Sequence, residues 1–250
     1  LDDDEAVAQA AGEGASGGET ATAEIGKVRL DVHKIEADPK ITNEELEDAD
    51  VDVEAWHAGK VASKISRVEN TAFINGDGVD GARGILTYPA WASAGVYERN
   101  KIEQIASGSA STLTADGLID LQNSLKEVYQ PNAVFLMKRK TWGVISKLKD
   151  GENNYLIDFA GRGLATDKMG NPMLLGKPVI FCDDMPEVAG SALPVAYGDF
   201  GAGYVIGDRR GLSVLRDPYS SKGFVSYYTT KRYCGGVVNF EAIKLQVVSS

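Results

Sequence analysis

The segment from Asp52 to Phe73 constrains the fold most, because its apolar residues keep close to a repeat of 3.6 residues. The residues that carry the repeat are Val53, Trp56, Val61, Ile65, Val68 and Ala72. At a rise of 1.5 Å per residue, a helix over this segment is about 30 Å long. We therefore predict one long, stiff helix. A shorter helix is predicted just before it, because Thr42 stands three residues ahead of Glu45 in the spacing of a capping box.

Shorter elements make up the rest of the chain. Val28, Leu30 and Val32 alternate with polar residues, which is the period of a strand with one wet face, so we predict a strand over 28–33. The further predictions are a helix from Thr114 or Asp116 through Tyr129, a buried strand at 132–137, a short helix at 138–148, a strand at Val179–Cys182, two short strands separated by glycines within 196–217, and a strand-rich end at 223–248 with Gly235-Gly236 as a turn or bulge. The fold class is α+β.

Composition and charge exclude several classes of protein. The chain has 250 residues, enough for one large domain or two smaller ones, and 43% of them are hydrophobic. No apolar run approaches the roughly 20 residues that cross a bilayer, so no membrane partner is expected. Residues 1–26 are rich in Gly, Ala, Glu and Thr and are predicted to form an extended or flexible arm. The first residue is Leu and the first segment is acidic, which indicates a processed chain or a fragment rather than a signal peptide.

The net charge of −10 argues against binding a polyanion, because such binding needs Lys and Arg on the phosphates. The run Lys138-Arg139-Lys140 is the exception that could form a local basic patch, although short basic runs are usually solvated surface. Cys182 and Cys234 stand far apart without metal-ligand spacing and are expected to be small buried residues.

The glycine-rich segment from Asn70 to Leu86 contains a G-x-G-x-x-G match at Gly76–Gly81. A dinucleotide site needs a strand before the glycines, and here they follow a helix, so the match fails on context. Calcium is the stronger alternative, with Asn75, Asp77 and Asp80 as oxygen ligands, but the EF-hand order of ligands is broken. The structural interpretation is a helix end with Gly76 as a left-handed cap and a turn at Asp77-Gly78.

No catalytic, cofactor or metal site emerges from the remaining residues. His33 lies in a predicted strand and His57 within the long helix, and neither is near a nucleophile in a recognisable frame. The acids between Glu44 and Glu54 could act as paired carboxylates, yet acids at a helix start are explained by the helix dipole. We therefore predict that the chain is not an enzyme, with a metal-dependent enzyme that uses the loop Asn75–Asp80 kept as an alternative.

Several pieces of the chain, taken in order, resemble the major capsid proteins of tailed double-stranded DNA bacteriophages (or prophages) with the HK97 fold. No single piece is diagnostic, but the series covers nearly the whole chain. The pieces are GETATAEIGKVRLDVHKIEADPKIT, VDVEAWHAGKVASKISRVENTAFINGDG followed by ARGIL, NAVFLMKRKTWGVISKLKDGENNYL, GNPMLLGKPVIFCDDMP, AYGDFGAGYVIGDRRGLSVLRDPY and GGVVNFEAIKL.

The resemblance implies an HK97-like capsid fold with a long spine helix, a peripheral domain, an axial domain and an extended loop. The implied assignment is the returning half of the extended loop at 1–29, the peripheral domain with its spine helix at 30–112, the axial domain at 113–216, peripheral-domain strands at 217–239, and a strand that rejoins the axial domain at 240–250. The arm before the extended loop, and the outgoing half of that loop, are expected to be missing from this chain. Without them we expect monomers or loose rings instead of closed shells. Some members of the family join subunits by a Lys–Asn bond, which we do not expect here because YSSKGFV contains no Asn.

The function implied by the resemblance is that of a structural subunit of an icosahedral phage head. Such a subunit associates with itself into hexamers and pentamers, encloses double-stranded DNA without specific binding, and meets portal, scaffold and protease proteins during assembly. It would be located in the virion and assembled in the cytoplasm of the bacterial host. The alternative from the same fold is the shell protein of a bacterial nanocompartment, which binds a cargo enzyme and holds no genome.

Overall fold

The structure is a computed structural model, and it describes residues 28–48, 50, 52–93, 95–156 and 172–249. The chain divides into two units, Leu1–Leu30 and Asp31–Ser250. Of the first unit only residues 28–30 are described, so the expected arm at 1–26 lies outside the described residues and all elements below belong to the second unit. Within the described part, none of the helices is both long and apolar enough to span a membrane.

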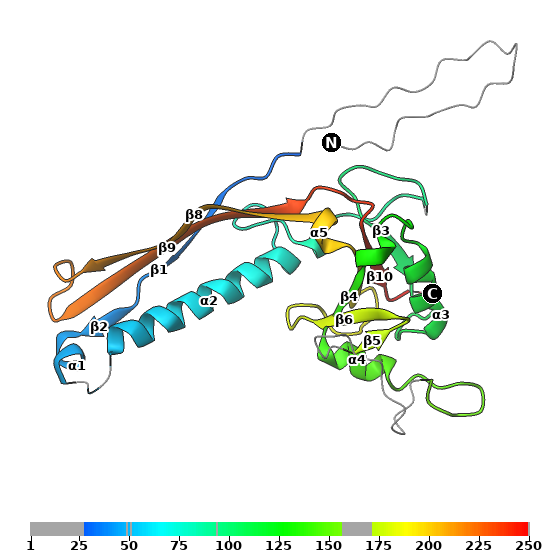
Figure 1. Cartoon of the computed structure of the whole chain (residues 1–250), viewed down its shortest axis with the longest axis horizontal. Coiled ribbons are helices and arrows are strands. Elements are labelled where there is room, and N and C mark those ends of the chain that lie inside the picture. The colour runs from blue at the N-terminus through cyan, green and yellow to red at the C-terminus, as the bar shows by residue number, and fades with distance from the viewer. Residues whose placement is uncertain (1–27, 49, 51, 94, 157–171, 250) are drawn as a thin grey trace, which may run out of the picture. The chain divides into compact units, whose positions relative to one another are not determined.

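The long helix is confirmed. It is α2, Val53–Asn75, and Asp52 caps it by accepting a hydrogen bond from the backbone N–H of Ala55 at 2.9 Å. The shorter helix before it, α1 (Asn43–Asp48), begins where the capping box predicts, with Thr42 Oγ1 accepting from the N–H of Glu45 at 3.2 Å. Figure 1 shows α2 running beside the strands β1, β8 and β9.

The end of α2 is closed differently from the prediction. Gly76 has φ −63° and ψ 146°, an extended conformation, so the left-handed cap expected there is wrong. Glycine is required at this position because a Cβ would lie 2.0 Å from the carbonyl oxygen of Ala82, where the chain returns against the helix end. The turn at Asp77-Gly78 is confirmed, since Gly78 has φ +78° and Asp77 Oδ1 accepts from the backbone N–H groups of Val79 and Asp80.

A four-stranded antiparallel sheet contains the long strand β9 with β8 on one side and β1 and β2 in succession on the other. Its strands are β1 (His33–Ala37), β2 (Lys40–Thr42), β8 (Tyr204–Asp217) and β9 (Phe224–Val237). The strand predicted at 28–33 is wrong in position, since β1 begins only at His33. Its pairing with β9, in which His33 lies opposite Tyr233, decides which residues belong to the sheet.

Glycines do not interrupt the long strands as expected. The segment 196–217 does not form two short strands split by glycines; β7 (Val195–Gly198) is short, but β8 runs through Gly207 and Gly211 with shifts of register against β9. The short helix α5, Phe200–Gly203, separates the two strands. Gly235 and Gly236 are likewise paired within β9 and form no turn. A Cβ on Gly235 would lie 2.7 Å from Tyr204 Oη and 2.9 Å from Phe73 Cε1, so the glycine makes room for these rings.

A six-stranded mixed sheet forms the second part of the fold, in the order β3-β10-β7-β4-β6-β5. Its remaining elements are β3 (Glu103–Ala106), α3 (Ala115–Asn123), β4 (Val134–Met137), α4 (Arg139–Ile145), β5 (Met173–Leu174), β6 (Lys177–Phe181), β10 (Ile243–Val247), and the 3-10 turns η1 (Ile85–Thr87) and η2 (Gln130–Asn132). The predicted strands at 132–137 and 179–182 and the short helix after the first of them are confirmed. The helix expected to reach Tyr129 ends at Asn123.

Two apolar cores hold these parts together. One lies between the six-stranded sheet and the helices α3 and α4, around Leu121, Phe135 and Tyr197. The other joins the C-terminal end of α2 to that sheet, because Ile74 packs in one cluster with Ile243 and Leu245 of β10. The long helix is therefore anchored in the core at one end.

The rings beside Gly235 give a test of the β9 strand. Gly235→Ala is expected to lower the free energy of unfolding by about 1–3 kcal/mol, because the new methyl group overpacks against Tyr204 and Phe73. Gly211→Ala is the matched control in the same hairpin, since its Cβ would meet no atom within 4 Å. Urea unfolding followed by circular dichroism measures both, and equal stability of the two variants would contradict the packing described.

Candidate functional site

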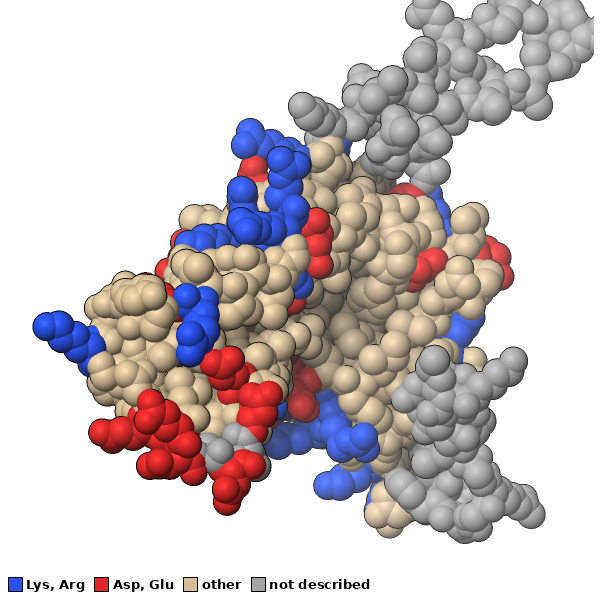
Figure 2. Space-filling view, turned by 60° about the vertical axis from the view of Figure 1, so that its left-hand side comes forward, with Lys and Arg blue, Asp and Glu red and all other residues tan. Residues whose placement is uncertain are grey.

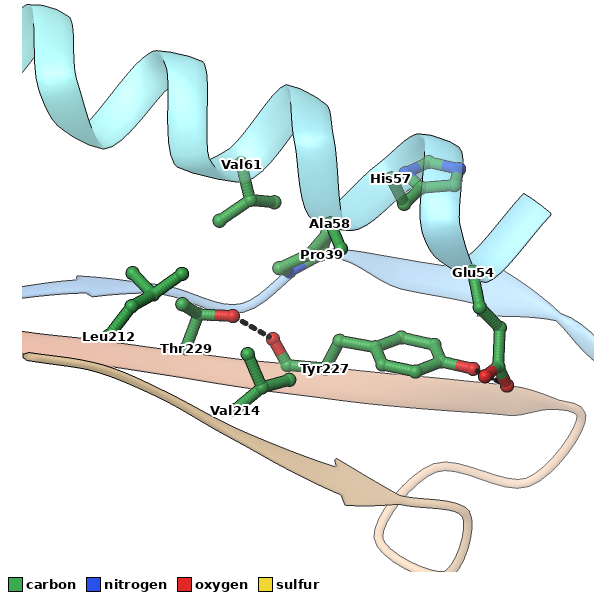
Figure 3. Close-up of a pocket in the computed structure, with 9 residues that line it drawn as sticks. All are labelled: Pro39, Glu54, His57, Ala58, Val61, Leu212, Val214, Tyr227 and Thr229. Carbon is green, nitrogen blue, oxygen red and sulfur yellow. Dashed lines mark hydrogen bonds between the residues drawn. The ribbon is translucent and has the colours of Figure 1, made fainter. Parts of the chain in front are cut away.

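Hydrogen bonds, ion pairs and aromatic contacts join α2 to the long hairpin of β8 and β9 (residues 204–237). We call this region the helix–hairpin contact. At the N-terminal end of α2, Glu54 Oε1 accepts hydrogen bonds from Arg216 Nε at 3.1 Å and from the hydroxyl of Tyr227. Figure 3 shows Glu54 reaching from the helix toward Tyr227 on β9. The side chains of Glu54 and Arg216 are about half exposed, at 47% and 53%, so this link is screened by water.

The hollow beside this link is too small for a ligand. Side chains of α2 and of the hairpin line it from opposite sides, as Figure 3 shows. The lining residues include His57, Ala58 and Val61 of α2 and Leu212, Val214 and Thr229 of the hairpin. The volume of the hollow is 20 Å³, room for about one water molecule. The region is a packed contact between helix and sheet.

A second link is more buried and lies farther along α2. Lys231 Nζ on β9 is 2.7 Å from Glu69 Oε1 and 3.4 Å from Asp208 Oδ1 on β8. The side chains of Glu69 and Lys231 are only 10% and 19% exposed. Burial lowers the pKa of Lys231, but the hydrogen bonds and charges of Glu69 and Asp208 together outweigh it, and the pKa is raised. One cation therefore joins the helix to both strands of the hairpin.

The third link is aromatic and lies near the C-terminal end of α2. The ring of Phe73 meets Tyr233 edge-on at 5.7 Å and Tyr204 at 5.9 Å. Tyr204 also donates a hydrogen bond to the backbone carbonyl of Arg83 at 3.0 Å, and burial raises the pKa of its hydroxyl. With one link at its start and two in its last two turns, α2 is held on the hairpin near both of its ends.

Polar side chains at the glycine-rich loop form hydrogen bonds with backbone groups. Asp77 accepts from the N–H groups of Val79 and Asp80, at 2.9 and 3.2 Å, and Asn75 donates its amide to the carbonyl of Asp184. Asn75 and Asp77 are therefore both engaged in hydrogen bonds with backbone groups of the protein. Among the described residues, no group of three or more His, Cys, Asp or Glu side chains could hold a metal ion.

The other residues considered in the sequence are dispersed. His33 is on β1, and His57 on α2 stacks edge-on against Trp56 at 4.9 Å. Cys182 and Cys234 are free cysteines, and burial raises the pKa of the Cys182 thiol. None of these groups forms a catalytic pair with another in the described part of the chain.

The basic run and the acidic run have different environments. Lys138 and Lys140 both pair with Glu187, at 3.4 and 2.7 Å, and Arg139 lies over the ring of Phe181. The run is therefore partly neutralised. The acids of α1 and the following turn are exposed, and Figure 2 shows acidic side chains gathered at the lower left of that view. These acids are Glu44, Glu45, Glu47, Asp48, Asp50 and Asp52.

Sequence reasoning missed the Glu69–Lys231 pair. Glu69 stands four residues after Ile65, on the side of α2 that is buried. A charged residue in phase with the apolar repeat was the available signal, since such a residue needs a partner. Its partner on β9 could not be inferred, because the register between helix and hairpin is a tertiary property.

This architecture is shared with capsid proteins. The capsid of a native GTA particle, described as computed with C5 symmetry, is 37% identical with a TM-score of 0.88, covering 100% of this chain and 84% of that one. A structure of Gordonia phage Cozz is 15% identical with a TM-score of 0.61, covering 98% of this chain and 78% of that one. The holo-SrpI encapsulin complex from Synechococcus elongatus PCC 7942 is 16% identical with a TM-score of 0.63, covering 86% and 73%. The last two similarities show the fold alone, and together the three define an HK97-like capsid fold.

The phage capsid family matches residues 1–248, and the chain belongs to that family. It is a structural protein with the expected α+β fold. Comparison with curated proteins gives no match.

Lys231→Met tests the buried link. Glu69 would then remain in a mostly buried position without its cation, and we expect the free energy of unfolding to fall by about 1–3 kcal/mol, the cost of a buried polar group that loses its partner. Lys34→Met is the control, because it removes a lysine whose pair with Glu36 is exposed on the same sheet, and it should leave stability nearly unchanged. Urea unfolding measures both, and equal losses would show that burial does not distinguish the two pairs.

The loop after α2 should respond to acid. The hydrogen bonds from Val79 and then Asp80 lower the pKa of Asp77, so its contribution to stability is complete above the unfolded pKa of about 4 and is lost as the pH falls through the lower folded value. Asp77→Asn should therefore flatten the acid side of a plot of unfolding temperature against pH. Asp80→Asn removes the same charge from the loop but keeps both hydrogen bonds, and it should retain the acid slope of the wild type. Identical slopes for both variants would contradict this role.

Proposed function

We propose that the chain is the structural subunit of an icosahedral phage head or phage-like particle, in which it assembles into hexamers and pentamers that enclose double-stranded DNA. The observation that carries the proposal is the 37% identity, over the whole chain, to the capsid of a GTA particle. The fivefold symmetry stated for that particle supports pentamers in particular.

The surface of the hairpin supports self-association. Strand β8 is at the edge of its sheet and exposes Val205, Ile206 and Leu215, each at least 41% exposed. Leu212 and Val214 on the same strand line the hollow between β8 and α2. An apolar edge strand of this length is an aggregation hazard unless another surface covers it. Repeated contacts of this kind between neighbouring copies close into rings when the rotation between copies is right.

We further propose that the domains follow the two sheets. The four-stranded sheet with α2 forms the peripheral domain, and the six-stranded sheet with α3 and α4 forms the axial domain. The boundary at 216 then moves to about 203, because β8 pairs with β9 along its length. Likewise β3, at 103–106, pairs with β10 and joins the axial domain. Residues 1–29 remain assigned to the returning half of the extended loop.

The nanocompartment alternative has less support, since its similarity at 16% identity concerns the fold alone. If the chain is a phage head subunit, the proposal includes contacts with portal, scaffold and protease proteins during assembly in the host cytoplasm. It also includes a final location in the virion. Terminase, portal and protease genes next to the coding gene would support it, and a cargo enzyme gene would favour the alternative.

Assembly is the direct test. Purified protein at high concentration should form rings of five or six subunits, visible by negative-stain electron microscopy and as discrete masses in mass photometry. Rings are expected because each subunit offers an uncovered apolar edge strand. Protein that stays monomeric at every concentration, also when produced together with its neighbouring genes, would contradict the proposal.

A further inference from the structure

The exposed side of α2 carries a row of cations that the helix–hairpin contact does not use. Lys60, Lys64 and Arg67 are all exposed, and their spacing of four and three residues places them on one side of the helix. Along the axis they span about 10 Å. We call these three residues the basic row.

The basic row stands apart from the acids of its own helix. The acidic residues of α2 are Glu54 and Glu69, and both are bonded to the hairpin on the opposite side. Within the described residues, no ion pair neutralises Lys60, Lys64 or Arg67, whereas lysines elsewhere, such as Lys140 and Lys231, are paired. In a chain of net charge −10, three uncompensated cations on one helix side form a distinct local surface.

An aromatic side chain extends this surface. Trp56 lies one turn before Lys60 and is 58% exposed, with Lys60 Nζ 5.4 Å from the centre of its ring. Acidic residues lie beyond both ends of the basic row. The exposed acids of α1 precede α2, and Asp77 and Asp80 follow it, bordering an open hollow together with Lys64 and Arg67.

The layering of this part of the fold leaves α2 with one free side. Its other side is covered by the four-stranded sheet. In a shell of the kind proposed above, the free side of α2 and the outer side of the sheet would therefore lie on opposite surfaces of the subunit. We propose that the basic row is the surface that contacts the phosphate backbone of the enclosed double-stranded DNA, with one phosphate for each of Lys60, Lys64 and Arg67. This inference rests on the proposed function.

The chemistry favours a DNA backbone as the occupant. A duplex carries one negative charge per about 1.7 Å of its axis, so the length of the row meets about six phosphate charges. The contact reads no base, because Lys and Arg on phosphates carry no sequence information. Three contacts per subunit are few, and the neighbouring acids keep the rest of this side repulsive, so the DNA is held weakly and without sequence preference.

The experiment compares two triple variants of the full chain that lose the same charge. One is Lys60→Gln, Lys64→Gln and Arg67→Gln. The matched control is Lys147→Gln, Arg209→Gln and Lys222→Gln, which removes three exposed cations from other elements. Fluorescence anisotropy with a labelled duplex of about 20 base pairs measures the affinity between about 50 and 200 mM salt.

The basic-row variant should reduce the slope of log affinity against log salt by about 3, since each phosphate contact contributes about 0.9. The affinity of the wild type should then fall about 40-fold more than that of the variant over this salt range. The control should keep the wild-type slope. Equal slopes for the two variants, or no binding by the wild type at the lowest salt, would overturn the inference.

Mass photometry of the same samples separates this inference from the proposed function. Rings that form normally while the two variants bind DNA alike leave the proposed function intact and reject the DNA contact. Rings lost in the basic-row variant alone, with DNA binding unchanged, would assign the row to an acidic surface of a second copy and also overturn the inference. Absence of rings from the wild type counts against the proposed function, whereas the salt slopes still decide the DNA contact.

Discussion

The attachment of α2 to β9 is the interaction on which the rest of the structure depends. An isolated helix of this length and polarity is marginal in water, because most helical stability in proteins comes from the packing of one side. Here that side is held by an exposed ion pair at the start, then by a buried ion pair and an aromatic cluster that follow each other in the last two turns. The three links differ in strength, and the burial of Glu69 and Lys231 makes the middle one the most sensitive to the loss of a partner.

The long hairpin is in turn fixed at its base by very close backbone contacts. Gly203 ends α5 just before β8, and its carbonyl accepts a hydrogen bond from the N–H of Val238, just after β9, at 2.9 Å. A Cβ on Gly203 would lie 2.6 Å from the side chain of Ile243, and one on Gly198 would lie 2.1 Å from the carbonyl of Ala242. The two strands therefore leave the six-stranded sheet and return to it at one place, where only glycine allows the chains to approach. This arrangement makes the hairpin and α2 an extension of the six-stranded sheet.

The distribution of charge agrees with a protein that works by contact with large, repeating surfaces. Most cations on the sheets are used within the subunit, as Lys244 shows, since it is buried with its Nζ 2.6 Å from Glu103 Oε2. Exposed apolar side chains gather on β8, and unpaired cations gather on the free side of α2. In the assembly proposed above, the first surface would contact neighbouring subunits and the second the enclosed DNA.

Local chemistry in the sequence determined several elements correctly. The periodic apolar residues defined α2, the capping box at Thr42 defined α1, and Asp77-Gly78 defined its turn, because each depends on residues within one or two helical turns. The order of motifs also indicated the capsid family, which the comparisons confirm. Only the tertiary structure decided the conformation of Gly76, the continuity of β8 and β9 through their glycines, the start of β1 at His33, and the pairing of Glu69 with Lys231. In each of these cases the deciding partner is a distant segment: the returning loop at Ala82, the ring of Phe73, the register against Tyr233, or a lysine on another strand. A glycine or a glutamate in a sequence shows that close approach or a counter-charge is needed, but only the packed chain shows which atom supplies it.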